Sequence, residues 1–162
     1  MPPSPLIAFA AGAHTYGLVQ LVPGAPLPAP LPPLLLPVAG MHVRAGFTSP
    51  ADDFLDKRID LNQVLITHPQ ATFLLRVAGD SMRDAGIHDG DTLVVNRALK
   101  PRHGHIVVAT LDGEFTVKYL HQRAGRTRLR PANPTFPDIV PRDGQTIEVV
   151  GVVTSAITRF IK

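Results

Sequence analysis

Residues 106–120 read IVVATLDGEFTVKYL and contain the strongest hairpin signal in the chain. Two β-rich runs flank Asp112-Gly113, a dipeptide that favours the tight turn of a β-hairpin. Side chains alternate along a strand, so Thr116 and Lys118 are expected to share one face of the second run. Lys118 therefore lies among apolar strand residues and not in a run of charges.

Turn-separated β-rich segments continue on both sides of this hairpin. Turn residues such as Asp89-Gly90-Asp91 separate them. Strands are expected at residues 71–78, 92–96, 106–111, 114–120, 127–130 and 146–158. Strands at this spacing, with one short helix, predict a mainly β fold: a compact, mostly antiparallel β domain.

The short helix is predicted at residues 61–66. Asp60 can cap its first turn, and Pro69 stops it. Its apolar stripe consists of Leu61, Val64 and Leu65.

The composition narrows the class of protein. A chain of 162 residues fits one domain with a core of its own. It contains no cysteine, which excludes disulfides, thiolate zinc sites and cysteine nucleophiles. The net charge of +3 permits attraction to nucleic acid or acidic partners without demanding it. A cytoplasmic location is expected.

The first forty residues differ from the rest. The first charged side chain is Arg44, and ten of the seventeen prolines lie in residues 1–40. These prolines break every candidate helix, so a signal peptide or membrane span fits poorly. Residues 27–37 are expected to form extended, polyproline-like chain. Two interpretations remain open. The first is a flexible leader or a mis-assigned start, with Met41 as the true initiator. The second is an extended arm that carries a cleavage site into the folded domain.

A candidate nucleophile follows the strand expected at residues 71–78. The sequence Val-Ala-Gly-Asp-Ser-Met spans residues 77–82, and Gly79 permits a sharp exit from the strand. The backbone N–H groups of Asp80 and Ser81 can form an oxyanion hole beside the Ser81 hydroxyl. A lysine among apolar strands loses hydration and favours its neutral form, so Lys118 can act as the base for Ser81. Taken alone, Ser81 is more typical of a turn residue, and Lys118 of a solvent-facing strand lysine.

From about Ala45 to its end the chain resembles the UmuD/LexA family of self-cleaving serine–lysine peptidases. The resemblance implies a LexA/signal-peptidase-like domain at residues 46–162 and an arm at residues 1–45 that self-cleavage removes. It also implies Ser81 as nucleophile, Lys118 as base and Ala45–Gly46 as the scissile bond. The matching segments are AGF at 45–47, SPADD at 49–53, RIDLN at 58–62, HP at 68–69, GDSM at 79–82, GI at 86–87, DGD at 89–91 and DGEFTVK at 112–118.

The same dipeptide occurs elsewhere, as Ala11-Gly12, Ala39-Gly40 and Ala124-Gly125. We favour Ala45–Gly46 because the family's Phe47 and Ser49-Pro50 follow it, and Ala39–Gly40 is the second candidate. A small residue before the cut fits a shallow pocket, and glycine after it lets the backbone kink toward the nucleophile.

The resemblance also implies a role in the SOS response to DNA damage. The expected partners are a second copy of the chain, a RecA–single-strand DNA filament as activator and an error-prone DNA polymerase of the UmuC type. One alternative is a non-catalytic polymerase-binding dimer. Another is a LexA-like repressor, but residues 1–40 lack the charge and helix that a DNA-reading domain requires. Sequence-specific DNA binding and membrane association are not expected.

Two other groups of residues have alternative interpretations. His103-Gly104-His105 is the tightest histidine pair, but it lacks acidic or cysteine ligands at metal spacing, so neither a metal nor a cofactor is expected. Four arginines between Arg123 and Arg130 form a basic run. The run is interpreted as a solvated strand face, with a contact to DNA or a polymerase as the alternative.

Overall fold

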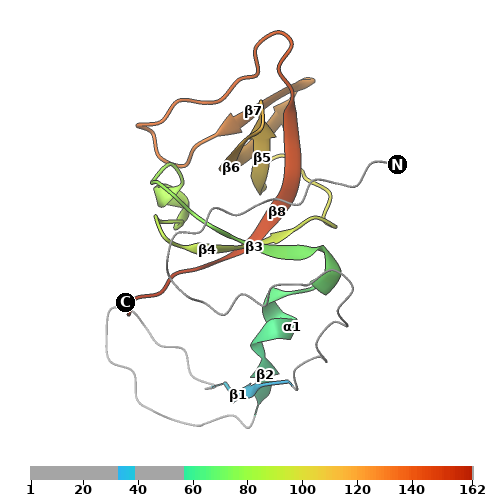
Figure 1. The fold of residues 1–162 in the computed structure, drawn as a ribbon, viewed down its shortest axis with the longest axis vertical. Coiled ribbons are helices and arrows are strands. Elements are labelled where there is room, and N and C mark those ends of the chain that lie inside the picture. Colours follow the sequence, from blue (N-terminus) through green and yellow to red (C-terminus); the bar gives the residue numbers. More distant parts are fainter. Residues whose placement is uncertain (1–32, 39–56, 162) are drawn as a thin grey trace. The chain divides into compact units, whose positions relative to one another are not determined.

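The strands that the structure describes form two antiparallel sheets. The computed structural model describes residues 33–38 and 57–161. The smaller sheet pairs β1 (Leu35–Pro37) with β2 (Arg58–Asp60), and the larger sheet has six strands in the order β3-β4-β8-β5-β6-β7 (Figure 1). The larger sheet consists of β3 (Thr72–Arg76), β4 (Thr92–Asn96), β5 (Ile106–Leu111), β6 (Glu114–Arg123), β7 (Arg126–Arg130) and β8 (Ile147–Ile157). The prediction of a mainly antiparallel β fold is confirmed.

The hairpin in residues 106–120 forms as predicted. β5 pairs with β6 from Leu111↔Glu114 to Ile106↔Tyr119. Asp112 has a φ of 52° and Gly113 a φ of 85°, the pair of positive values that the tightest hairpin turn requires. β6 continues to Arg123, beyond the predicted end of the strand, because it also pairs with β7.

β8 is the strand that joins the two halves of the larger sheet. Its C-terminal half, from Val152 to Ile157, pairs with β4, and its N-terminal half, from Ile147 to Val152, pairs with β5. Each pairing contains one register irregularity, which bends the sheet locally. In Figure 1 the orange-red strand β8 accordingly extends from β5 to β4.

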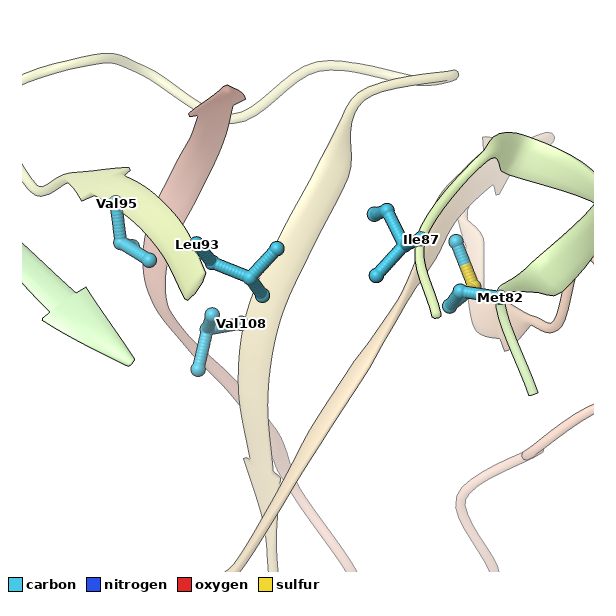
Figure 2. Close-up of a cluster of buried hydrophobic side chains, with 5 residues drawn as sticks. All are labelled: Met82, Ile87, Leu93, Val95 and Val108. Atoms are coloured by element: carbon cyan, nitrogen blue, oxygen red, sulfur yellow. The ribbon is translucent and has the colours of Figure 1, made fainter. Parts of the chain in front are cut away.

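Hydrophobic side chains cover both faces of the sheet. Val108 belongs to one buried cluster and Val107 to another, because neighbouring residues on β5 point to opposite faces. The first cluster consists of Met82, Ile87, Leu93, Val95 and Val108 (Figure 2). The second consists of Val107, Ala109, Leu120, Leu129 and Val152.

The predicted helix forms, with two differences. α1 (Leu61–Leu65) begins after Asp60, whose side chain accepts a hydrogen bond of 2.9 Å from the Asn62 N–H, so the cap is confirmed. Its C-cap, Ile66, is extended. The apolar stripe is exposed, since Leu61 is 46% and Val64 58% accessible. Two single-turn 3₁₀ helices, η1 (Pro69–Ala71) and η2 (Arg83–Ala85), complete the described elements.

The structure describes the predicted arm only at residues 33–38. There the expectation of polyproline-like chain is wrong for Leu35–Pro37, which forms β1 because pairing with β2 satisfies its backbone groups. Pro37 is tolerated at the end of this short strand. The boundary at residues 45–46 lies outside the described residues. Within the described ranges, no helix has the length and apolarity needed to cross a membrane.

We predict that Gly151→Ala destabilises the fold. A Cβ atom at Gly151 would lie 2.7 Å from Val95 Cγ1 and 3.2 Å from the Asn96 carbonyl oxygen, so β4 would have to move away from β8. The free energy of unfolding should fall by about 2 kcal/mol in urea titrations. Glu148→Ala, on an exposed position of the same strand, is the control and should stay within about 0.5 kcal/mol of the wild type. Equal effects of the two changes would contradict the close packing.

Candidate active site

Ser81 lies in the loop of residues 77–82 that follows β3, here called the serine loop. Hydrogen bonds to residues 89–91 hold the start of this loop, and the Val77 N–H donates to the Asp91 carbonyl oxygen at 2.9 Å. Gly79 has a φ of 87°, a conformation that favours glycine, and its N–H donates to Asp89 Oδ1 at 2.7 Å. The side chain of Met82 is buried in the first hydrophobic cluster. The residues on both sides of Ser81 are therefore anchored.

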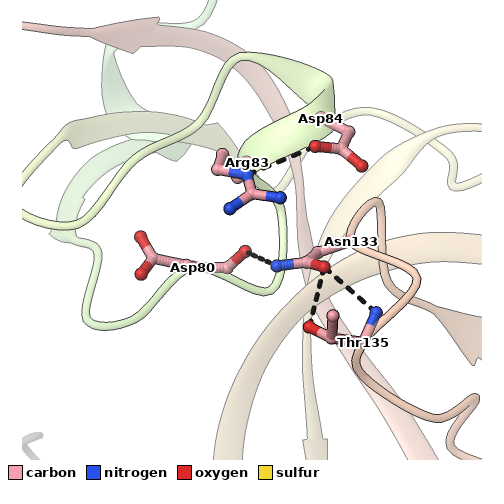
Figure 3. Close-up of polar contacts among 5 residues, drawn as sticks. All are labelled: Asp80, Arg83, Asp84, Asn133 and Thr135. Atoms are coloured by element: carbon pink, nitrogen blue, oxygen red, sulfur yellow. Dashed lines mark hydrogen bonds and ion pairs between the residues drawn. The ribbon is translucent and has the colours of Figure 1, made fainter.

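Asn133 connects the serine loop to the far end of β7. The N–H groups of Ala132 and Asn133 donate to the Ser81 carbonyl oxygen at 2.9 and 3.0 Å. The Asn133 side chain is 3% exposed and donates from Nδ2 to the Asp80 carbonyl oxygen at 3.1 Å (Figure 3). Its Oδ1 accepts from the N–H and the hydroxyl of Thr135. Both polar atoms of the Asn133 side chain, Nδ2 and Oδ1, thus form hydrogen bonds.

The predictions made from the sequence assign no role to Asn133. The available signal was the asparagine before a proline, a pair that favours local side-chain hydrogen bonds of the kind Asn133 makes to Thr135. The bond to Asp80 spans 53 residues and has no local signature.

The Lys118 amine lies against the Ser81 hydroxyl. Lys118 Nζ is 2.7 Å from Ser81 Oγ, 3.0 Å from Thr116 Oγ1 and 2.9 Å from the Val117 carbonyl oxygen. The contact with Thr116 agrees with the prediction that these two side chains share a face. The structure therefore brings together the two residues that the sequence analysis singled out.

The end of β7 explains how the two residues meet. β6 pairs with β7 only from Tyr119 to Arg123, so Lys118 lies immediately beyond the paired region. Arg130, the last residue of β7, is opposite Tyr119, and the chain then continues to Ala132 and Asn133. Because these two residues bind the Ser81 carbonyl oxygen, the serine loop is held beside the part of β6 that β7 leaves unpaired.

The surroundings of Lys118 favour a neutral amine. The side chain is 7% exposed, and this burial lowers the pKa of Lys118 from its ordinary value. Within the described residues, no aspartate or glutamate forms an ion pair with it. A neutral amine has two N–H donors and one lone pair. The Val117 carbonyl oxygen can only accept, and the Thr116 hydroxyl can also accept, which leaves the lone pair for the Ser81 hydroxyl proton.

Asp80 and Ser81 each have a backbone N–H beside the hydroxyl. Among the hydrogen bonds that involve residues 33–38 and 57–161, none uses either of these N–H groups as a donor. Their carbonyl groups, in contrast, are fixed by Asn133 and Ala132. Unpaired donors on a fixed backbone are what an oxyanion hole requires.

Of the Ala-Gly dipeptides in the sequence, the structure describes Ala124-Gly125 and not the two candidate cleavage sites. Ala45–Gly46 and Ala39–Gly40 lie outside the described residues. Ala124-Gly125 forms the turn between β6 and β7, with φ values of 48° and 74°. A dipeptide held in a tight turn is not extended chain that could enter the site.

The two histidines of the His103-Gly104-His105 segment do not pack against each other in the structure. His103 packs against His121, with ring centroids 4.8 Å apart, and not against His105. In the described part of the chain, no three histidine, aspartate or glutamate side chains are grouped so that they could hold a metal ion.

Comparison with known proteins identifies the family. Residues 37–154 match the family described as Peptidase S24-like. Protein SamA of Salmonella typhimurium is 48% identical over 113 residues, which cover 70% of this chain and 78% of SamA. Protein ImpA of Escherichia coli is 47% identical over 125 residues, 76% of this chain and 83% of ImpA. The LexA repressor of Paracidovorax citrulli is 40% identical over 132 residues, 81% of this chain and 58% of the repressor.

The chain therefore belongs to the peptidase S24-like family, and its general class is that of the self-cleaving serine peptidases. This confirms the resemblance to the UmuD/LexA family. The relatives SamA and ImpA match over more of their own length than the LexA repressor does.

We predict that Asn133→Asp loosens the serine loop. The substitution keeps an acceptor for Thr135 but replaces the Nδ2 donor to the Asp80 carbonyl oxygen with a buried carboxylate oxygen. The free energy of unfolding should fall by about 2 kcal/mol. Thr135→Val is the control: it removes one donor to Asn133 and leaves the bond to Asp80, so it should cost about 1 kcal/mol or less. An Asn133→Asp protein as stable as the wild type would exclude this role.

A second prediction concerns the pH dependence of stability. Because the folded-state pKa of Lys118 is below the ordinary value of 10.5, the unfolded chain binds more protons than the folded chain between these two values. Burial of the charged amine therefore destabilises the fold at neutral pH, and stability is regained as the pH rises toward 10.5. This gain should be absent from Lys118→Met in urea titrations across that range. Lys100→Met, which removes an exposed lysine, controls for net charge, and a gain retained in Lys118→Met would contradict the assignment.

Proposed function

We propose that this chain cleaves itself at Ala45–Gly46, with Ser81 as nucleophile and Lys118 as general base, and that the processed protein serves SOS mutagenesis. The observation that carries the proposal is the 2.7 Å contact between Lys118 Nζ and Ser81 Oγ, made by a buried amine with a lowered pKa. A serine next to an uncharged amine satisfies the requirement for an activated nucleophile without a histidine.

The proposed reaction uses only groups at this site. Neutral Lys118 takes the Ser81 hydroxyl proton while Oγ attacks the carbonyl carbon of Ala45. The negative charge on that carbonyl oxygen is stabilised by the N–H groups of Asp80 and Ser81, worth about 3 kcal/mol for each donor. The C–N bond to Gly46 breaks, and the Lys118 ammonium gives its proton to the departing amine. Lys118 then removes a proton from a water molecule that attacks the ester carbonyl carbon, and it returns this proton to Ser81 Oγ as the ester C–O bond breaks and the Ala45 carboxylate is released.

The position of the substrate in the chain supports this proposal. The Val38 N–H donates to the Lys57 carbonyl oxygen at 2.8 Å, next to the β1–β2 pairing. Ala45–Gly46 lies in the segment between these two residues, so both ends of that segment are attached to described strands. Attachment of a substrate to its catalyst replaces a bimolecular encounter and raises the effective concentration of the bond.

The proposed cellular role follows from the family. Residues 1–45 would be the arm that is removed, and residues 46–162 the active product. That product would be a cytoplasmic homodimer and an accessory subunit of an error-prone DNA polymerase of the UmuC type. A RecA–single-strand DNA filament would activate cleavage by favouring the arrangement in which the arm enters the site, without adding a catalytic group. The coverage of SamA and ImpA, at 78% and 83% of their lengths, supports this role over that of a LexA-like repressor, of which 58% is covered.

We predict that self-cleavage requires both residues and rises with pH. Purified protein incubated at alkaline pH should yield a fragment beginning at Gly46, detected by intact mass. Its rate should increase with pH through the pKa of Lys118, below 10.5, because only the neutral amine acts as a base. Ser81→Ala and Lys118→Ala should each slow cleavage by about 10³-fold or more. Ser155→Ala and Lys100→Ala are matched controls.

Two outcomes would overturn parts of the proposal. Loss of residues 1–45 from Ser81→Ala would exclude Ser81 as nucleophile, and a fragment beginning at Gly40 would move the cut to Ala39–Gly40. A mutagenesis assay in damaged cells tests the role of processing. The proposal expects activity from a version beginning at Gly46 and a loss with full-length Ser81→Ala, whereas equal activity would favour the non-catalytic polymerase-binding dimer.

A further inference from the structure

The β6–β7 ribbon carries a row of arginines on one face. Residues directly opposite each other in an antiparallel pair point to the same side of the sheet. The pairs Tyr119↔Arg130, His121↔Arg128 and Arg123↔Arg126 therefore define one surface, the basic ribbon face. It consists of Tyr119, His121, Arg123, Arg126, Arg128 and Arg130. Lys118 alternates with Tyr119 on β6 and thus points to the opposite side.

This face has more positive than negative charge. Arg123, Arg126 and Arg130 are exposed, and Arg128 is partly exposed. In the described part of the chain, Asp138 is the one carboxylate paired with the face, at 3.2 Å from Arg128 Nη1 and 3.7 Å from Arg130 Nε. The basic ribbon face thus has four guanidinium groups and one paired carboxylate, which leaves an excess of positive charge. Partial burial and the positive charges of Arg128, His103, Arg123 and Arg130 lower the pKa of His121, which agrees with an uncompensated positive field.

A cavity with aromatic walls adjoins the arginines. It has a volume of about 310 Å³, and Tyr119, His121, His103 and Arg130 are among the residues that line it. The His103 ring lies edge-on to His121, and its Nδ1 accepts a hydrogen bond from the Gln122 N–H at 3.1 Å. Aromatic and imidazole side chains therefore line the cavity together with Arg130.

The spacing of the arginines indicates a repeating anion. Arg126, Arg128 and Arg130 are two residues apart on β7, so their Cα atoms are about 7 Å apart. Guanidinium groups bind phosphate oxygens in a bidentate manner. Proteins that bind single strands without sequence preference combine a positive track for the backbone with aromatic side chains on which bases stack. An acidic peptide would use the arginines but has no need of the aromatic cavity.

We propose that the basic ribbon face binds single-stranded nucleic acid without sequence preference, with the arginines on successive phosphates and a base in the cavity against Tyr119 or His121. The face and Lys118 are on opposite sides of β6, so the proposed binding uses none of the residues proposed for self-cleavage. It also differs from the sequence-specific DNA reading of a repressor, because the contacts are to the backbone and to one stacked base.

Charge reversal at the hairpin turn tests the proposal. Binding of a fluorescein-labelled dT20 to the full chain is measured by anisotropy over a range of salt concentrations. Arg123→Glu combined with Arg126→Glu should weaken binding at least about tenfold, and should reduce the salt dependence of log K by about 1.4, at about 0.7 for each phosphate contact. The matched control combines Arg76→Glu with Arg97→Glu. It makes the same change in net charge at exposed residues on and next to β3 and β4, at the other end of the sheet. Equal losses in the two double variants would show attraction to net charge alone and overturn the proposal.

A second comparison tests the role of the base. The wild type should bind dT20 more tightly than an abasic oligonucleotide of equal length, and His121→Ala should reduce that preference. Thermal unfolding of each variant identifies losses caused by misfolding. Polyglutamate that competes as well as dT20, or equal binding of dT20 and the abasic strand, would instead make the face a general site for acidic chains.

Discussion

The pairing of β8 with both β4 and β5 is the constraint on which the site depends. Ser81 follows β3, in the half of the sheet that ends on β4, whereas Lys118 lies on β6, in the half that begins with β5. Within the larger sheet, only β8 is hydrogen-bonded to both halves. Gly151 allows the close approach of β8 to Val95 that this pairing needs. Ser81 and Lys118, which are 37 residues apart, thus take their positions from a strand that contains neither of them.

Burial of the Lys118 amine lowers the stability of the fold. A buried lysine without a carboxylate partner is unfavourable when charged, and the same desolvation prepares it to accept a proton. The loop that carries Ser81 is stabilised by hydrogen bonds from the Gly79 N–H to Asp89 Oδ1 and from the Ala132 and Asn133 N–H groups to the Ser81 carbonyl oxygen. Burial of the Lys118 amine thus lowers the stability of the fold, while the backbone hydrogen bonds of the neighbouring loop raise it.

Most of the fold was predictable because its signals are local. The Asp112-Gly113 turn, the Asp60 cap and the strands of the larger sheet follow from turn residues and alternation, and all of them form. The resemblance singled out Ser81 and Lys118, but nothing local to either residue places them in contact. Three features were not predicted: the anchoring of the serine loop by Asn133, the pairing of β1, and the exposure of the α1 stripe. Each of these features depends on which distant segment of the chain packs against the residues concerned. The alternation and spacing of residues in the sequence do not indicate such long-range partners.

The short β1–β2 pairing affects what becomes of an arm once it is cut. While the chain is continuous, β1 and β2 are parts of one molecule, and their three residue pairs need only resist local fraying. A break between Val38 and Lys57 makes β1 a separate peptide, and its binding then becomes a concentration-dependent equilibrium. Two short strands alone are marginal in water, so dilution would drive the fragment off and leave the edge of β2 open. The cut chain cannot be rejoined, so uncut protein is restored only by synthesis of a new chain. Cleavage between Val38 and Lys57 would therefore be an irreversible step and not a reversible switch.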